Sequence, residues 1–302
     1  MNTYIPLPNS SAGSPVQFSE PAAYSYENCH CCPRNCQINR TKKQGWCHSP
    51  AGIRAARAAL HPWEEPCISG LHGSGTIFFS GCALRCVYCH NPDTWTTKDA
   101  DWQTADEVLK KALRYKNYWG EKGGITVSGG EPLLQIDFLI ELFRKAKKNG
   151  VHTTLDTSGN PFTREEPYFS KFNELMKYTD LLLLDIKLID DKAHRELTGC
   201  TNENILDLAR YLDEIGKPVW IRHVLVPERS DYDEYLIRLD EFLHSLHNVQ
   251  RVEVLPYHTL GVFKWETLGI PYKLEGINPP TKERVENANK LLHTAEYTGY
   301  LK

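Results

Sequence analysis

Beyond residue 74 the sequence alternates short β-rich runs with amphipathic stretches, and this alternation constrains the fold more than any other feature. Strands are predicted at residues 76–79, 125–128, 152–156, 181–187, 219–226 and 252–256. Helices are predicted at residues 104–115, 135–148, 167–178, 191–197, 202–214 and 231–246. Such alternation is typical of βα units in a mainly parallel sheet. Because right-handed βα units curl toward a barrel, six of them predict an α/β fold with a partial (β/α)6 barrel.

The first 70 residues lack this alternation. Residues 1–23 are rich in Pro, Ser, Ala and Asn and are expected to form a flexible leader. Residues 24–70 contain a Cys-dense run and a connector, in which residues 51–60 are predicted to form a short helix because alanine favours helices. We therefore expect a leader at 1–23, a small Cys-rich extension at 24–70 and a core domain at 71–302.

Charge and cysteine usage exclude several classes of protein. The net charge of −3 gives no global electrostatic reason to expect nucleic-acid binding. No apolar run approaches the roughly 18 to 20 residues that cross a bilayer, and the N-terminus lacks the features of a secretory signal. Ten cysteines without an export signal favour reduced thiols and metal ligands over disulfides. The sequence thus predicts a cytoplasmic protein without membrane or nucleic-acid partners.

Three cysteines follow the first predicted strand. Cys82, Cys86 and Cys89 have the spacing C-x3-C-x2-C. A [4Fe-4S] cluster normally takes four Cys ligands, so three thiolates would leave one iron open to a substrate or cofactor. The alternatives are part of a zinc site or a buried apolar cluster, but structural zinc usually has four ligands in paired C-x2-C units. The spacing, with the aromatic Tyr88 between the last two cysteines, resembles the radical S-adenosylmethionine (SAM) superfamily.

This resemblance implies a cofactor set and a chemistry. In the superfamily the open iron binds the amino and carboxylate groups of SAM, and reductive cleavage gives methionine and a 5′-deoxyadenosyl radical. The fold it implies is a radical-SAM barrel. Cys82, Cys86 and Cys89 are then the catalytic cluster ligands.

Polar residues follow or end the other predicted strands. They are Ser128, Gly129, Gly130, Glu131, Asp156, Thr157, Asp185, Lys187, Arg222 and His258. Taken alone, each has an ordinary interpretation as a strand-to-helix turn, a surface ion pair or a hydrogen-bonded packing residue. Barrel active sites, however, form where the strands end, so we expect these residues to converge on one mouth.

Residues 86–302 are similar to the pyruvate formate-lyase activating enzyme family. The similarity is carried by residues 88–95, 123–131, 155–157, 184–187, 220–227 and 255–258. It implies a monomeric oxidoreductase that works under anaerobic conditions. With electrons from a flavodoxin or ferredoxin, it would use the 5′-deoxyadenosyl radical to abstract hydrogen from a backbone glycine of a glycyl-radical enzyme of the pyruvate formate-lyase type.

The family resemblance also implies ligand contacts. The SAM site would be formed by Tyr88, Asn91, Ser128, Gly129, Gly130, Glu131, Asp185, Lys187, Arg222 and His258. A monovalent cation beside the SAM carboxylate would be held by Asp156, Thr157, Leu183 and Asp185. Such a cation would offset the clustered negative charge.

A second cysteine array lies upstream. Cys29, Cys32, Cys36 and Cys47 have the spacing C-x2-C-x3-C-x10-C, which can close a zinc site or a second iron-sulfur cluster. The alternative is coincidental free cysteines. Spare candidate ligands are His30, Cys31 and His48, whereas Cys67 and Cys200 are expected to be ordinary thiols.

The upstream sequence departs from the activating enzymes. It is similar to their Cys-rich homologues, and residues 71–75 lack the aspartate that those enzymes carry in a Val-Asp-Gly-Pro-Gly segment. That aspartate helps to organise the partner's glycyl loop. The alternative function is therefore a radical SAM enzyme acting on another protein or a small molecule, with an auxiliary cluster or zinc at the N-terminus. A third possibility is a metal-stabilised binding protein that has lost catalysis.

Overall fold

The computed structural model describes residues 27–49, 54–61, 74–96, 101–119 and 123–301. One eight-stranded sheet has the strand order β3-β1-β2-β4-β5-β6-β7-β8. The leader predicted at residues 1–23 and most of the connector lie outside the described residues. No helix in the described part of the chain is long and apolar enough to cross a membrane.

The strands are β1 (Arg54–His61), β2 (Ser74–Phe79), β3 (Asp101–Trp102), β4 (Gly124–Gly129), β5 (His152–Thr157), β6 (Leu181–Asp185), β7 (Val219–Leu225) and β8 (Val249–Pro256). The α-helices are α2 (Ala105–Leu113), α3 (Ile136–Lys148), α4 (Tyr168–Met176), α5 (Asp191–Thr198), α6 (Glu203–Glu214), α7 (Asp233–His244), α8 (Val262–Thr267) and α9 (Lys282–Leu291). Short 3-10 helices are η1 (Pro92–Trp95), η2 (Lys116–Tyr118), η3 (Pro132–Gln135), η4 (Thr294–Glu296) and η5 (Gly299–Leu301).

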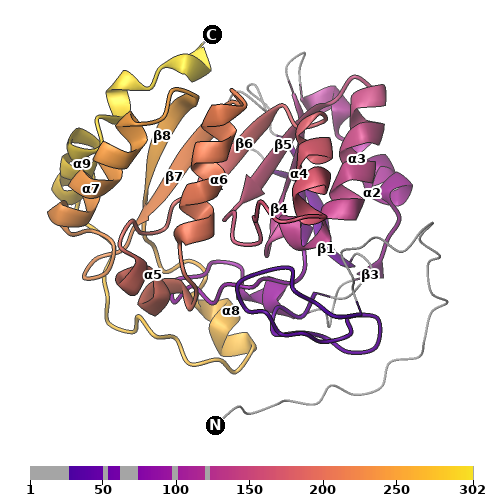
Figure 1. Ribbon diagram of the computed structural model, residues 1–302. Helices are drawn as coiled ribbons and strands as arrows, with labels where there is room; N and C mark the ends of the chain where they lie inside the picture. The colour runs from indigo at the N-terminus through magenta and orange to yellow at the C-terminus, as the bar shows by residue number, and fades with distance from the viewer. Residues whose placement is uncertain (1–26, 50–53, 62–73, 97–100, 120–122, 302) are drawn as a thin grey trace.

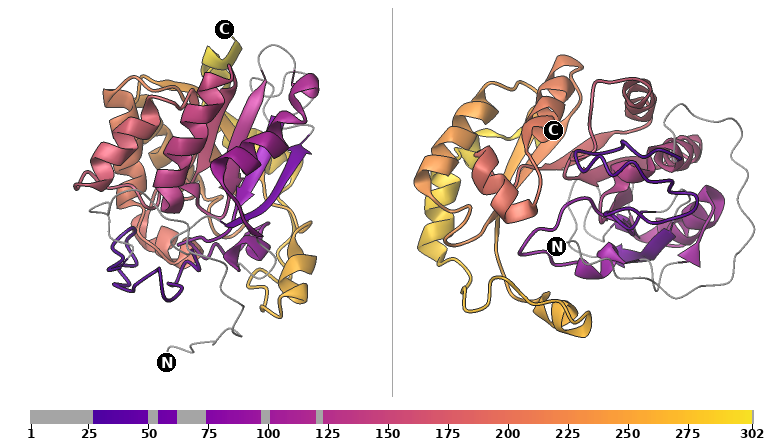
Figure 2. Two further views of the ribbon diagram at one scale, coloured as in Figure 1. Left: turned by 90° about the vertical axis from the view of Figure 1, so that its right-hand side faces the viewer. Right: turned by 60° about the horizontal axis from the view of Figure 1, so that its bottom comes forward.

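The six predicted strands are confirmed as a parallel set. Strands β2, β4, β5, β6, β7 and β8 pair in that order, each parallel to its neighbour. Helices α3, α4 and α6 cover one side of the sheet, as the turned view makes clear (Figure 2). The α/β partial barrel expected from the alternation is therefore the observed fold.

The helix predicted at residues 51–60 is wrong. Residues 54–61 form strand β1, which pairs antiparallel with β2 and with the two-residue strand β3. Helix propensity is a weak prior. The parallel set would otherwise end at β2 with a row of unpaired backbone groups, and an added antiparallel strand satisfies them.

The alternation of side chains along the strands separates a packed face from a polar one. Ile77, Ile125, Leu155, Leu184 and Ile221 are fully buried and belong to one large core with the covering helices. The intervening positions point to the other face. Several of these positions in the first strands are threonines. Near the ends of the strands the corresponding positions carry charged side chains or a serine, and these side chains form the candidate site.

Candidate active site

The cysteine loop, residues 80–91, leaves the end of β2 and carries Cys82, Cys86 and Cys89. Cys82 and Cys86 are each 8% exposed, and Cys89 is partly buried. The end of α5 holds the loop, because the backbone amide of Arg85 donates to the carbonyl oxygen of Thr198 (2.8 Å) and that of Val87 to Leu197 (3.0 Å). The three thiols are thus fixed on one short segment at the mouth of the barrel.

The surroundings of these thiols fit a metal cluster. Burial raises the pKa of all three thiols, and the charge of Cys86 raises the pKa of Cys82 and Cys89 further. Lys187 acts in the opposite sense and lowers the pKa of Cys86 and Cys89. Metal binding removes protons from thiols and so overcomes this cost. Three neighbouring buried thiols beside a cation are a suitable donor set for a cluster with one open iron.

Two glycines bring the β4 backbone against this loop. Gly129 has a φ of +118°, a left-handed conformation that glycine adopts without strain. A Cβ on Gly130 would overlap the carbonyl oxygen of Gly81. The backbone amide of Glu131 donates to that same oxygen (2.8 Å). The absence of side chains at these two positions therefore lets the backbone pack directly against β2 and the cysteine loop.

Glu131 is fully buried and holds the loop after β5. Its carboxylate accepts hydrogen bonds from the Thr157 hydroxyl (2.6 Å), the Ser158 hydroxyl (2.5 Å) and amide (3.0 Å), and the Leu133 amide (3.0 Å). Burial raises the pKa of Glu131, although the bonds from Ser158 and Thr157 lower it in part. In this structure both oxygens of the Glu131 carboxylate accept hydrogen bonds from the protein. A direct contact of this carboxylate with SAM stays a prediction.

The ends of β4 to β7 carry one connected group of polar side chains. Arg222 donates to both Asp156 and Asp185, and the latter bond is 3.3 Å long. Lys187 donates to the other oxygen of Asp185 (2.9 Å), and Ser128 donates to Asp156 (2.6 Å). Register explains the convergence, since Asp185 pairs with Arg222 across β6 and β7.

Asp185 and Lys187 favour each other's charged form. Burial alone would raise the pKa of Asp185, but Lys187 and Arg222 outweigh it and hold the pKa below its usual value. Burial alone would lower the pKa of Lys187, yet Asp185, with Tyr88 and Cys86, keeps it well above normal. The mouth thus offers fixed positive and negative groups within one small region.

Aromatic residues complete the mouth. Tyr88 is buried beneath Lys187, whose Nζ lies 5.8 Å from the ring centre. The His90 and His258 rings stack at 3.8 Å, and His90 Nε2 lies 3.0 Å from the His258 carbonyl oxygen. Burial first, and His258 second, lower the pKa of His90 to about 4. Burial also lowers the pKa of His258, so both rings favour the neutral form.

Sequence reasoning missed the contribution of helix α8. Lys264 donates to the side-chain oxygen of Asn91 (2.9 Å), and Trp265 donates from Nε1 to the carbonyl oxygen of Cys89 (2.8 Å). The Trp265 ring also packs edge-on against Trp95. Helix α8 was not among the predicted helices, because its six residues are too short for a clear periodic pattern.

The upstream cysteines lie directly against the cysteine loop. We call residues 27–49 the N-terminal module; it is the indigo segment beside α5 and α8 in Figure 1. The carbonyl oxygen of Cys47 accepts from the Cys82 amide (2.9 Å), and that of Trp46 accepts from Arg85 (2.7 Å). Arg34 in turn donates to the Ala83 carbonyl oxygen (3.0 Å). The two cysteine groups, distant in sequence, are thus adjacent.

Two further functional candidates in the module are Arg40 and Cys31, which the cysteine spacing alone does not single out. Arg40 is 3% exposed and donates to Cys31 Sγ (3.0 Å), the Ser49 hydroxyl (2.8 Å) and the Leu134 carbonyl oxygen (3.3 Å). Cys29 Sγ lies 2.8 Å from Cys31 Sγ. A buried guanidinium among thiols favours their anionic form. The structure therefore places Cys31, which the sequence offers as a spare ligand, directly beside Cys29 of the four-cysteine array.

Neither cysteine group has the compact arrangement of a closed single-metal site. In tetrahedral zinc sites the Zn–S distance of about 2.3 Å places sulfurs within about 4 Å of each other. Within the described residues, no three thiols all lie within 4.8 Å of one another.

The comparison with known families defines the class of protein. The family model described as "Radical SAM superfamily" matches residues 76–240. A solved radical SAM methyltransferase from Sphaerobacter thermophilus shares the fold, with a TM-score of 0.53, 20% identity, and coverage of 73% of this chain and 63% of that one. The chain therefore belongs to the radical SAM superfamily, and membership implies a [4Fe-4S] cluster and SAM as its cofactors.

Sequence relatives narrow this class. The chain is 58% identical over 228 residues to the pyruvate formate-lyase-activating enzyme of Streptococcus mutans, covering 75% of this chain and 87% of that protein. It is 51% identical over 222 residues to the enzyme of the same name from Listeria monocytogenes, covering 73% and 90%. Within the superfamily, the chain falls in the family of these activating enzymes, as the sequence resemblance predicted.

Proposed function

We propose that this chain activates a glycyl-radical enzyme of the pyruvate formate-lyase type. The observation that carries the proposal is its 58% identity to an activating enzyme, extending over 87% of that relative. The radical SAM family model matches residues 76–240, which include the cysteine loop and the polar ends of β4 to β7. The cofactors of the superfamily and the geometry of the site support the same chemistry.

Cys82, Cys86 and Cys89 would hold the [4Fe-4S] cluster. When bound, the cluster supplies the electron that splits SAM into methionine and a 5′-deoxyadenosyl radical, which takes hydrogen from a backbone glycine of the partner and leaves the radical there. The protein contributes a loop that fixes three thiolates and buries those of Cys82 and Cys86 away from water. Lys187 beside them offsets part of their negative charge.

The remaining mouth residues would bind SAM. The Lys187 ammonium and the Arg222 guanidinium can pair with its carboxylate, and the backbone carbonyl groups of Gly129 and Gly130 would accept hydrogen bonds from its amino group. Asp185 holds both cations in place. Tyr88, Asn91, Ser128 and His258 would contribute the further contacts, and Glu131 would act by fixing the loop after β5.

A monovalent cation would have to share its carboxylates with Arg222. Asp156 lies opposite Leu183 across β5 and β6, and Thr157 is the next residue, so the four proposed ligands are adjacent. Arg222 already bridges Asp156 and Asp185. We infer that a cation binds on the side of these carboxylates facing away from Arg222.

The N-terminal module would hold a second metal centre, an iron-sulfur cluster or zinc. Cys29, Cys32, Cys36 and Cys47 remain the proposed ligands, with Cys31 as the fifth thiol of the group. The nine described cysteines are all free thiols, which supports a reducing, cytoplasmic setting. A flavodoxin or ferredoxin would then deliver the electrons to the chain, which we expect to act as a monomer.

The experiment is an anaerobic EPR assay of the reconstituted, reduced chain with SAM and purified pyruvate formate-lyase. A glycyl doublet is expected with the parent chain and not with Cys86→Ala. Cys200→Ala is the matched control, because it removes a buried thiol that lies outside both proposed ligand sets. Loss of the doublet only in Cys86→Ala supports the proposal.

A second candidate is a radical SAM enzyme with another protein or small molecule as substrate. It is favoured by the contact of the N-terminal module with the cysteine loop through Cys47 and Cys82. An auxiliary centre at this position could act on a different substrate. In the same assay, continued 5′-deoxyadenosine formation without any doublet would replace the first proposal with this one.

A further inference from the structure

A group of metal-type ligands lies on the helical layer, at the opposite end of α7 from the barrel mouth. Asp240 and His244 are one turn apart on α7, so they share a helix face. His293 lies in the turn between α9 and η4, which packs against α7. No residue of the candidate active site takes part.

The three side chains meet at their donor atoms. His293 Nδ1 lies 3.0 Å from one Asp240 oxygen, and His244 Nδ1 lies 3.3 Å from the other. In a tetrahedral site with metal distances of about 2.1 Å, ligand atoms are separated by about 3.4 Å. One nitrogen or oxygen from each residue falls within 4.8 Å of the other two. To enclose one ion, the group needs mainly that His244 exchange its hydrogen bond from Nδ1 to the Asp240 carbonyl oxygen (3.0 Å) for the metal.

A second observation points to a ligand at Asp240. Its side chain is 13% exposed, and the one close contact given for its Oδ1 is His244 Nδ1 at 3.3 Å, a nitrogen that hydrogen-bonds instead to the Asp240 carbonyl oxygen (3.0 Å). The buried Tyr297 hydroxyl has no hydrogen-bond partner among the described residues. Buried polar atoms of this kind are uncommon unless an ion or water satisfies them.

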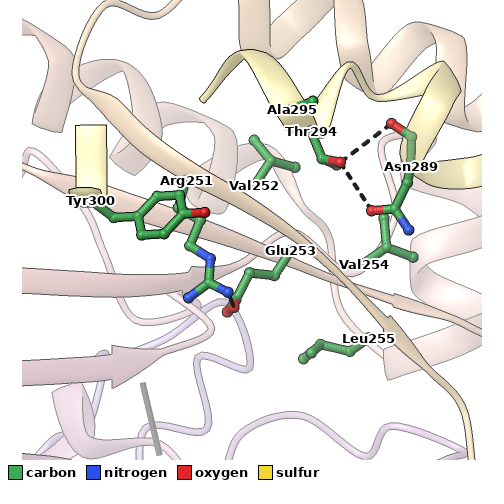
Figure 3. Close-up of a pocket in the computed structure, with 9 residues that line it drawn as sticks. All are labelled: Arg251, Val252, Glu253, Val254, Leu255, Asn289, Thr294, Ala295 and Tyr300. Atoms are coloured by element: carbon green, nitrogen blue, oxygen red, sulfur yellow. Dashed lines mark hydrogen bonds and ion pairs between the residues drawn. The ribbon is translucent and has the colours of Figure 1, made fainter. Parts of the chain in front are cut away.

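The turn that carries His293 is held firmly. The Thr294 hydroxyl donates to the Asn289 side chain (3.0 Å), and both line a cavity of about 330 Å³ along β8 (Figure 3). Arg251 and Tyr300 lie across the same cavity, with the guanidinium 4.6 Å from the ring centre. His293 itself has a φ of 44°, an unusual value for a residue other than glycine. This backbone conformation therefore directs the His293 imidazole toward α7.

We propose that Asp240, His244 and His293 bind one Zn²⁺ ion, with water in the remaining position. Two imidazoles and one carboxylate are donors that zinc accepts, whereas magnesium and calcium prefer oxygen donors alone. Glu296 lies at the edge of the group, 3.8 Å from His244 Nε2. The ion would tie the C-terminal turn to α7.

Zinc and iron counts on the holoenzyme test this site. The chain is reconstituted anaerobically with iron and sulfide so that the cysteine sites are filled, equilibrated with Zn²⁺ alone, and freed of excess metal. We expect one zinc fewer per chain in His293→Ala and in Asp240→Asn than in the parent, with unchanged iron. His247→Ala is the matched control, since it removes an exposed histidine just beyond α7 that pairs with Asp213.

Thermal unfolding provides the second readout. Zn²⁺ should raise the midpoint of the parent and of His247→Ala but not that of either site variant, because an ion that binds only the folded state stabilises it. Asp240→Asn keeps the shape of the side chain, so a difference there reports charge and ligation. Equal zinc content in all four proteins would overturn the proposal and leave a hydrogen-bonded His-Asp group.

Discussion

The cysteine loop and the N-terminal module both present clustered thiols, but they are built in different ways. The loop follows the end of β2 directly, and backbone hydrogen bonds attach it to the end of α5. The module has neither helix nor strand in its described residues 27–49 and is held by Arg34, Arg40 and the Cys47 backbone. Sheet geometry therefore positions the first group, whereas hydrogen bonds of Arg34, Arg40 and the Cys47 backbone position the second.

This difference predicts which substitutions should affect activity and stability most. The loop is bounded by backbone atoms of Gly81 and Gly130, which cannot move without disturbing the sheet. The module is bounded by flexible side chains that can adjust. We expect changes on the sheet side to affect catalysis and stability strongly, and changes in the module to be partly accommodated.

The largest contrast is expected between two alanine substitutions. In Gly130→Ala the new Cβ would overlap the Gly81 carbonyl oxygen, which should abolish SAM cleavage by displacing the cysteine loop. In Gly45→Ala the Cβ would meet only side-chain atoms of Cys36 and Ile38, each at 3.2 Å. More than half of the activity should remain. Anaerobic 5′-deoxyadenosine assays measure both, and equal activities would contradict the contrast.

Glu131→Gln should have the next largest effect, in this case on stability. All four groups that bond to the Glu131 carboxylate are donors, so an amide would place its own N–H groups against one or two of them. We expect a loss of about 3 kcal/mol in the free energy of unfolding. Urea denaturation measures it. Glu141→Gln, on the exposed face of α3, is the control and should change stability by less than about 0.5 kcal/mol.

His194 lies in α5, the helix that holds the cysteine loop, and should make the free energy of unfolding sensitive to acid. Burial lowers its pKa to about 4, so between pH 6.5 and 4 the unfolded chain binds more protons than the folded one. Stability therefore falls as the pH drops through this window, by about 2 to 4 kcal/mol for this residue. His194→Gln should flatten the pH dependence of denaturant midpoints. A slope identical to the parent's would contradict the assignment, with exposed His247→Gln as the comparison.

Arg40→Lys should have the smallest effect of this series. Lysine keeps the charge but loses the fork that contacts Cys31, Ser49 and Leu134 together. We expect a loss of about 1 to 2 kcal/mol in unfolding free energy and a lower metal content of the module. SAM cleavage should remain. Lys43→Arg, at an exposed position of the same module, is the control.

The sequence predicted the parallel half of the fold well, because short β-rich runs, most of them buried in the structure, alternate with amphipathic helices. It failed at β1, where alanine-rich residues 54–61 favour a helix locally and only the free edge of β2 makes them a strand. The site residues at strand ends were identifiable because parallel strands end together. The anchoring role of Glu131 and the contacts of Arg40 depend on residues distant in sequence, so no local pattern reveals them.

The central claim is that the cysteine loop, and not the N-terminal module, holds the cluster that cleaves SAM. It is tested by 5′-deoxyadenosine formation in two variants, one with Cys82, Cys86 and Cys89 replaced by alanine and one with Cys29, Cys32, Cys36 and Cys47 replaced. We predict no product from the first, and product from the second, which loses only the metal of the module. Product from the first variant, or its absence from the second with loop-bound iron still present, would contradict the claim.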